Sequence, residues 1–191
     1  MKNALLIVTV LFAAIMSTAC INNFAVQELN SKAQEYIAKG DYDAAIGRLE
    51  ASIDIDPTIF ETNYNLGIAA ISAEKYEKAV AALEAAKTLR PENPDVYYSL
   101  AVAQYNYAEQ VLETDEKDVS IDLEKNKKDE KINTDDLKKV YDLYADARKS
   151  LVKYLEFKNI DEESKVSAQQ QLLSIENKLE EIAPKLPKEI E

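Results

Sequence analysis

The sequence predicts an all-α fold in which pairs of helices stack side by side as a solenoid. The first observation is an internal repeat with a period of 34 residues. Tyr42, Ala45, Leu49 and Pro57 recur as Tyr76, Ala79, Leu83 and Pro91. The second observation is that apolar residues are three or four positions apart along most of the chain, which is typical of one helix face. Repeats of this length are supersecondary units that bury their apolar faces only by stacking on one another.

The N-terminal residues 1–19 have the pattern of a secretory signal peptide. Lys2 supplies a positive charge, and Ala4–Met16 is an apolar run interrupted only by Thr9. This run is short for a membrane span, which needs about 20 apolar residues. It suits the apolar region of a signal peptide, and the small residues 17–19 that follow suit a cleavage site.

Cys20, the only cysteine of the chain, follows that segment directly. Residues 17–20 resemble the lipobox of bacterial lipoproteins, although Ser17 stands where leucine is commonest. The resemblance implies that Cys20 is diacylated on sulfur, with palmitate-type chains, and becomes the mature N-terminus. Two or more acyl chains hold a protein stably on a membrane. Residues 20–25 would then be a short lipidated tether; the alternatives are an ordinary signal peptide and an uncleaved anchor.

The first two units are predicted at residues 26–59 and 60–93. In the first unit, Leu29 and Ala33 begin a helical face, and Gly40 supplies the positive φ of a helix C-cap. A second helix ends near Pro57, because proline cannot continue a helix. The second unit repeats this order and ends at Pro91.

These two units resemble the tetratricopeptide repeat family over residues 26–93. The matching residues are Leu66-Gly67 in the first helix, Ala79 and Leu83 in the second, and the final Pro91. The first unit departs from the pattern at Leu29 and Lys32. The resemblance implies antiparallel helix pairs, which approach closely where side chains are small.

A divergent third unit is predicted at residues 94–160. It starts in register at Pro94, but its apolar pattern runs on to Leu112, which lengthens the helix by about two turns. A charged insertion at about 113–134 follows, without glycine or proline, and is expected to be a flexible loop or a weak solvated helix. The alternative is a docking segment for a partner. A long helix from Thr134 to Tyr154 then completes the unit.

The last predicted element is a capping helix at 161–183. It carries an apolar face with Ala168, Leu172, Ile175, Leu179 and Ile182. Repeat arrays need a terminal helix with a polar outer face to shield the last core. The tail at 184–191 contains two prolines and is expected to fray.

The composition argues against several classes of function. The chain has 23 Lys and Arg against 35 Asp and Glu, a net charge of −12, which disfavours nucleic-acid binding. It has no histidine and only three glycines, so neither the commonest general base nor a glycine-rich phosphate loop is present. The acidic stretch at 113–124 lacks the turn glycine of a calcium loop. We therefore expect no enzyme activity, no cofactor and no metal site.

The resemblance also implies that the first helix of each pair lines a concave groove. The expected groove residues are Asn30, Gln34, Ile37, Tyr64, Ile68, Ile71, Tyr98, Val102 and Tyr105. One class of the family clamps acidic peptide C-termini with cations in this groove. The corresponding positions here include Asn30, Gln34, Asn65, Asp95 and Ser99, with no cation among them. We therefore expect that acidic C-termini do not bind in that manner.

Two occupants of the groove are compatible with the sequence: an apolar or amphipathic partner segment, or the chain's own C-terminal helix. The resemblance implies an interaction adaptor or scaffold in bacterial envelope assembly, lipid-anchored and facing the periplasm or the exterior. The alternative is a ligand-binding component of an uptake system, with a cavity under the C-terminal helices. A closed apolar cavity would favour that alternative, and an open groove would favour the adaptor.

Overall fold

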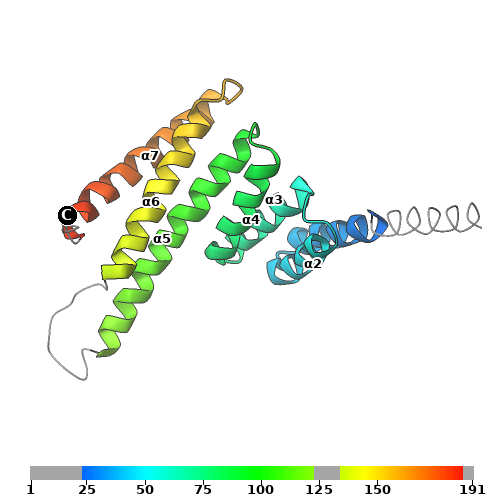
Figure 1. The fold of residues 1–191 in the computed structure, drawn as a ribbon, viewed down its shortest axis with the longest axis horizontal. Helices are drawn as coiled ribbons and strands as arrows, with labels where there is room; N and C mark the ends of the chain where they lie inside the picture. The colour runs from blue at the N-terminus through cyan, green and yellow to red at the C-terminus, as the bar shows by residue number, and fades with distance from the viewer. Residues whose placement is uncertain (1–22, 123–133, 187–191) are drawn as a thin grey trace, which may run out of the picture.

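The computed structural model describes residues 23–122 and 134–186, and within these ranges the chain is helical without strands. A first helix, described over 23–38, precedes the others. They are α2 (Tyr42–Ile55), α3 (Phe60–Ser72), α4 (Tyr76–Leu89), α5 (Pro94–Asp122), α6 (Thr134–Leu155), α7 (Glu162–Ile182) and the short 3₁₀ helix η1 (Ala183–Lys185). Successive helices pack as a solenoid that ends in a bundle of α5, α6 and α7 (Figure 1). The predicted all-α solenoid is confirmed, whereas the predicted signal peptide, Cys20 and the last residues of the tail lie outside the described ranges.

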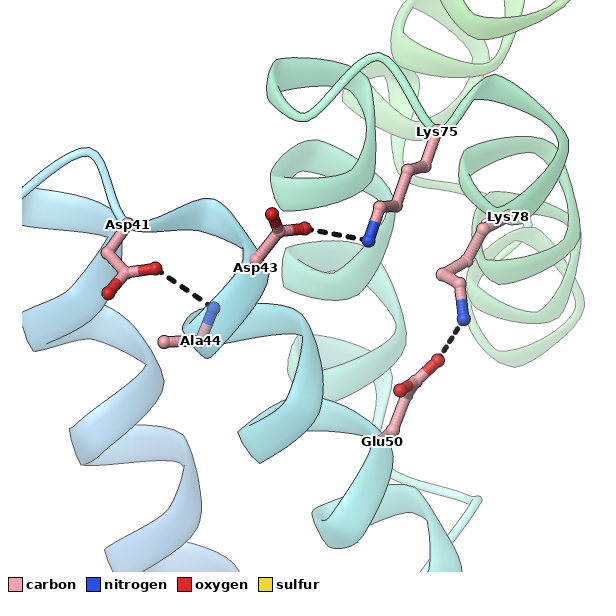
Figure 2. A network of polar contacts seen from close by, with 6 residues as sticks. All are labelled: Asp41, Asp43, Ala44, Glu50, Lys75 and Lys78. Atoms are coloured by element: carbon pink, nitrogen blue, oxygen red, sulfur yellow. Dashed lines mark hydrogen bonds and ion pairs between the residues drawn. The ribbon is translucent and has the colours of Figure 1, made fainter.

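The turns between paired helices follow the predicted chemistry in the first unit and depart from it in the second. Gly40 has a φ of 75°, as a left-handed C-cap requires. The next residue, Asp41, caps α2 by accepting a hydrogen bond from the Ala44 N–H at 3.1 Å (Figure 2). Glu74 occupies the position equivalent to Gly40 and has a φ of 57°. The second turn therefore holds a side chain in a backbone region that favours glycine.

Ion pairs on the surface join equivalent second helices. Lys75 Nζ lies 2.7 Å from Asp43 Oδ1, and Lys78 pairs with Glu50, so that α2 is connected to the start of α4 and its first turn (Figure 2). All four side chains are substantially exposed. Exposed pairs of this kind contribute about 0–1 kcal/mol each. These ion pairs therefore connect the two units but contribute little to the stability of the fold.

A buried polar network connects the first helix to the next two helices. Asn30 Nδ2 donates to Ser52 Oγ of α2 at 2.9 Å, and Thr62 Oγ1 of α3 donates to Asn30 Oδ1 at 3.1 Å. Ser52 and Thr62 are fully buried. Because a buried polar group without a partner is costly, this network fixes how the first unit meets the second.

Two large hydrophobic cores lie along the solenoid, and α5 contributes to both. The N-terminal core is built from the first helix, α2, α3 and α4, and it includes Leu100 and Ala103 of α5. The C-terminal core is built from α6 and α7, and it includes Ala101 and Ala108 of α5. Different faces of one helix thus couple the regular repeats to the C-terminal bundle. The predicted capping role of 161–183 is met by α7, whose Ile175 is fully buried in the C-terminal core.

The close approach predicted at Gly67 is present between α3 and α4. A β-carbon built on Gly67 would lie 2.8 Å from Leu83 Cδ2 and closer still to Cγ. Leu83 is fully buried, so its side chain has little room to move away. By contrast, a β-carbon on Gly47 in α2 would meet nothing within 4 Å.

Gly67→Ala is therefore expected to lower the free energy of unfolding by about 1–2 kcal/mol. Overpacking costs about 1–3 kcal/mol, and the helix preference of alanine over glycine returns up to about 1 kcal/mol. Gly47→Ala is the matched control and should raise stability by about 0.5–1 kcal/mol. Urea denaturation followed by circular dichroism measures both. Equal shifts of the same sign would contradict a tight α3–α4 contact.

The helix α5 extends further than the apolar pattern indicates. It continues for ten residues past Leu112, so the first part of the predicted insertion is helical up to Asp122. Residues 113–122 contain neither glycine nor proline, and extending an existing helix is far cheaper than starting one. Residues 123–133 of the insertion lie outside the described ranges. Within those ranges no helix combines the length and hydropathy that a membrane span requires.

Candidate functional site

A cavity of about 670 Å³ lies where α3, the start of α5, the end of α6 and the start of α7 meet. We call it the concave pocket, because α3 and α5 are the first helices of their pairs. Its lining residues are Tyr64, Asp95, Tyr98, Ser99, Tyr154, Asp161, Glu163, Ser164 and Ser167. It therefore combines three tyrosines with three carboxylates and three serines.

Contacts around the pocket fix the positions of its tyrosine rings. The rings of Tyr98 and Tyr154 are tilted against each other with centroids 5.3 Å apart, which joins α5 to α6. Tyr64 stacks on Phe60 at 5.7 Å, and its hydroxyl lies 3.3 Å from Ser99 Oγ. Aromatic pairs at these separations are favourable beyond the area that they bury. The pocket thus has a preformed aromatic wall.

The charge of the concave pocket is negative. Asp95, Asp161 and Glu163 line it, and no basic residue of the described ranges does. Asp161 caps α7 by accepting hydrogen bonds from the Ser164 N–H at 2.9 Å and from Ser164 Oγ at 2.7 Å. The hydrogen bond from the Ser164 backbone, followed by that from its hydroxyl, lowers the pKa of Asp161 below its ordinary value. This carboxylate is therefore ionised at neutral pH.

An adjoining cavity of about 440 Å³ extends the acidic surface towards the turn before α5. It shares Asp95, Tyr154, Asp161 and Ser164 with the concave pocket and adds Glu92 and Arg90, among others. The Arg90 guanidinium lies 4.2 Å from the Phe60 ring centroid, and its Nη2 lies 2.6 Å from Glu61 Oε1. Arg90, which lines this adjoining cavity, therefore already has a carboxylate partner.

A polar triad holds α7 against α5 and α6 at a distance from the pocket. The hydroxyl of Tyr144 donates to Glu109 Oε1, and Lys178 Nζ lies 2.8 Å from the same oxygen. Burial raises the pKa of Tyr144 well above its ordinary value, so the phenol stays protonated and donates. Burial also acts to raise the pKa of Glu109, but the hydrogen bonds from Lys178 and Tyr144 outweigh it and lower the pKa. The triad thus keeps α7 anchored with Glu109 ionised.

The lowered pKa of Glu109 predicts a specific loss of stability in acid. A carboxyl whose pKa is lower in the folded state stabilises the fold above its unfolded value and loses this contribution as the pH falls. The stability difference between the wild type and Glu109→Gln should therefore be constant at neutral pH and shrink below the ordinary value of 4.5. Urea denaturation of both proteins between pH 7 and pH 3 measures this. A difference that stays constant through acid would contradict the triad.

The structure distributes the nine predicted groove residues among different environments. Tyr64 and Tyr98 line the concave pocket. The amide of Asn30 is used in the internal network, while Ile37 and Ile71 pack against the N-terminal core. Tyr105 packs on Tyr144 with ring centroids 5.6 Å apart. Gln34 is exposed, and Ile68 and Val102 are half-buried.

The chain's own C-terminal helix borders the groove without lying along it. α7 packs chiefly against α6, and only its cap Asp161 and first two turns reach the concave pocket. Tyr98 and Tyr105 instead pack against Tyr154 and Tyr144 of α6. The C-terminal helices therefore form one wall of the pocket and leave its volume open.

The sequence-based list omits several residues of the pocket. Tyr154 fits the apolar spacing of α6, and Asp161 marks the start of a helix, so both have a structural explanation in the sequence. Glu163 and Ser167 are exposed on α7, and the half-buried Ser164 lies one turn before Ala168, where the apolar face of α7 begins. A useful signal was present in Asp95 and Ser99, which occupy groove positions of the family pattern and both line the pocket.

A third cavity, of about 710 Å³, lies between α4 and α6 over Tyr97 and Gln104 of α5. Its rim mixes basic and acidic side chains, namely Lys87, Arg148, Lys149, Lys153, Glu84, Asp146 and Glu156. None of these three cavities is the closed apolar site that a small-molecule carrier would need. Among the described residues, no group of three or more acidic or thiol side chains is placed to hold a metal ion.

Comparison with known proteins identifies the repeats. A family model described as "Tetratricopeptide repeat" matches residues 36–102. The first such domain of Spaghetti (RPAP3), solved with an HSP90 peptide SRMEEVD, is 18% identical, with a TM-score of 0.56 over 81% of this chain and 92% of that one. The type III secretion translocator chaperone SycD from Yersinia enterocolitica is 15% identical, with a TM-score of 0.52 over 81% and 86%.

The Sgt2 domain of Aspergillus fumigatus is 16% identical, with a TM-score of 0.50 over 87% of each chain. At these identities the neighbours establish the fold. The period of 34 residues, the antiparallel pairs and the close contact at Gly67 agree with the family match. Residues 36–102 therefore match the tetratricopeptide repeat family, and the chain has the fold of tetratricopeptide repeat domains.

Proposed function

We propose that this protein is a lipid-anchored interaction adaptor of a bacterial cell envelope and that it binds a protein or peptide segment in the concave pocket. Tetratricopeptide repeat domains are mostly interaction modules without catalytic groups. The observation that carries the proposal is the open pocket on α3 and α5, whose aromatic wall is already formed. Preformed aromatic sites are the usual anchors of protein interfaces.

The neighbours support binding of a protein segment, but the peptide bound to one of them differs from the partner that we propose here. The Spaghetti domain was solved with the peptide SRMEEVD, which contains two glutamates and an aspartate. In the part of this chain that the structure describes, three carboxylates line the concave pocket, and no cation does. An acidic segment would be repelled at that position. We therefore propose a partner that is not acidic where it enters the pocket.

The envelope location is supported by the N-terminal sequence. The apolar run Ala4–Met16 and the small residues after it end at Cys20, the only thiol of the chain. If Cys20 carries the lipid, Cys20→Ser should move from the membrane fraction to the soluble fraction of the native host. The wild type is the control, and both are measured by fractionation and immunoblot. A Cys20→Ser protein that remains on membranes would contradict acylation at this residue.

Binding in the concave pocket can be tested with two matched variants on α7. Ser167 lines the pocket and is exposed, whereas Ser174 is also exposed on the same helix but does not line the pocket. Peptides that bind the full-length chain in mild detergent are first selected from a display library of random peptides. Ser167→Arg should weaken the affinity for the selected peptides by about tenfold or more, because the arginine side chain fills the pocket. Ser174→Arg should bind like the wild type, and equal effects of the two variants would contradict the proposal.

A further inference from the structure

We propose that the concave pocket recognises a basic side chain, lysine or arginine, presented by the partner segment. This inference rests on the proposed function and specifies the chemistry of its site. Three features of the pocket support it: uncompensated carboxylates, aromatic rings on the same wall, and a guanidinium already stacked on a ring at its border.

The first feature is the negative charge that remains available to a ligand. Among the described residues, no basic side chain pairs with Asp95 or Glu163, and both are exposed. Asp161 adds a third carboxylate, which is kept ionised by its hydrogen bonds to Ser164. Nearby Arg90 does not offset these charges, because it is paired with Glu61. A cation that enters the pocket would therefore gain attraction without displacing an internal partner.

The second feature is the aromatic wall. Tyr64, Tyr98 and Tyr154 come from three different helices and line the same cavity of about 670 Å³. The negative face of an aromatic ring attracts ammonium and guanidinium groups, and arginine does so most often. Carboxylates beside aromatic rings favour a cation over a neutral apolar side chain, which the rings alone would also accept.

The third feature is a similar arrangement within the chain itself. Arg90 lies 4.2 Å from the Phe60 ring centroid and bonds Glu61, so a guanidinium is held between a ring and a carboxylate. Phe60 in turn stacks on Tyr64, which lines the pocket. A partner's arginine in the concave pocket would repeat this arrangement one ring further along α3.

The inference is tested with two small probes of the same shape and different charge. N-acetyl-arginine methylamide carries the cation, and N-acetyl-citrulline methylamide replaces it with a neutral urea. NMR of the full-length chain in detergent, with labelled tyrosine rings, reports binding. The arginine probe should shift the Tyr64, Tyr98 and Tyr154 resonances, and the shifts should saturate at millimolar concentrations of the probe. Added salt should weaken this binding. The citrulline probe should leave them unchanged.

Two double variants that remove the same number of charges test which carboxylates bind the arginine probe. Asp95→Asn with Glu163→Gln removes two charges from the pocket and should weaken the affinity for the arginine probe by about tenfold. Glu176→Gln with Glu180→Gln removes two exposed charges elsewhere on α7 and should leave binding unchanged. Thermal melts by circular dichroism verify that all variants fold. Citrulline binding as tight as arginine, or no saturable shift of the three rings, would overturn the inference.

The same variants separate this inference from the proposed function. In one outcome, Ser167→Arg weakens binding of the displayed peptides, but these peptides are not enriched in lysine or arginine and bind the Asp95→Asn/Glu163→Gln variant as tightly as the wild type. Peptide binding in the pocket is then supported, and recognition of a basic side chain is wrong. If the arginine probe binds as expected but no displayed peptide does, the pocket chemistry stands and the adaptor role fails.

Discussion

Replacing Tyr144 with alanine is expected to lower the free energy of unfolding by about 3–5 kcal/mol, as large-to-small changes of buried aromatic residues do. Tyr144 is the largest fully buried side chain of the described residues and belongs to the C-terminal core. Its ring packs against Tyr105 of α5, and its hydroxyl donates to Glu109. The substitution thus leaves a cavity and removes a donor at the junction of α5, α6 and α7.

Tyr144→Phe separates these two contributions. It keeps the ring and removes only the donor, so we expect a loss of about 1.5 kcal/mol, typical of a hydrogen bond to a charged group. Urea denaturation followed by circular dichroism gives both values. If Tyr144→Ala cost no more than Tyr144→Phe, the ring could not be at the centre of a packed core.

Removing α7 is expected to unfold the C-terminal half while the regular repeats stay helical. Ending the chain after Ile160 deletes the fully buried Ile175 and Ala168 from the C-terminal core, and uncovers buried residues of α6. Repeat arrays depend on a terminal element of this kind for solubility. The loss of helical circular dichroism should exceed the 21 residues of α7, and binding of a dye to exposed apolar surface should rise.

A chain that ends at Leu186 is the matched control, because it keeps α7 and η1. It should melt like the full-length protein. A truncation after Ile160 that lost only the helical signal of α7 itself, with an unchanged melting temperature, would show that α7 is not a structural part of the bundle.

The regular part of the fold was predictable because each unit repeats the same local rules. The positive φ at Gly40 and the small residue at Gly67 both follow from geometry that any antiparallel helix pair must satisfy. Glu74 was not predictable in this way: it adopts the backbone conformation of Gly40, and its carbonyl accepts a hydrogen bond from Gln110 Nε2 of α5 at 3.2 Å. Tertiary structure overrides local preference at that turn.

The candidate site was only partly predictable, because it is formed between units. Tyr64 and Tyr98 follow from the family pattern, whereas Tyr154 and Glu163 enter the pocket only because α6 and α7 return alongside α5. No periodicity within one helix encodes where a later helix will end. The extension of α5 to Asp122 has a similar origin, since propagation from a packed helix outweighs an unfavourable composition.

The central claim is that successive helix pairs bring Tyr64 of α3 and Tyr98 of α5 together with Tyr154 of α6, and that partners bind at this point. The most direct test attaches a nitroxide to a displayed peptide that the protein selects and follows the labelled tyrosine rings by NMR. The nitroxide should broaden Tyr64, Tyr98 and Tyr154 more strongly than Tyr141, which precedes Tyr154 by about 20 Å along α6. Stronger broadening of Tyr141 than of the other three would contradict the account.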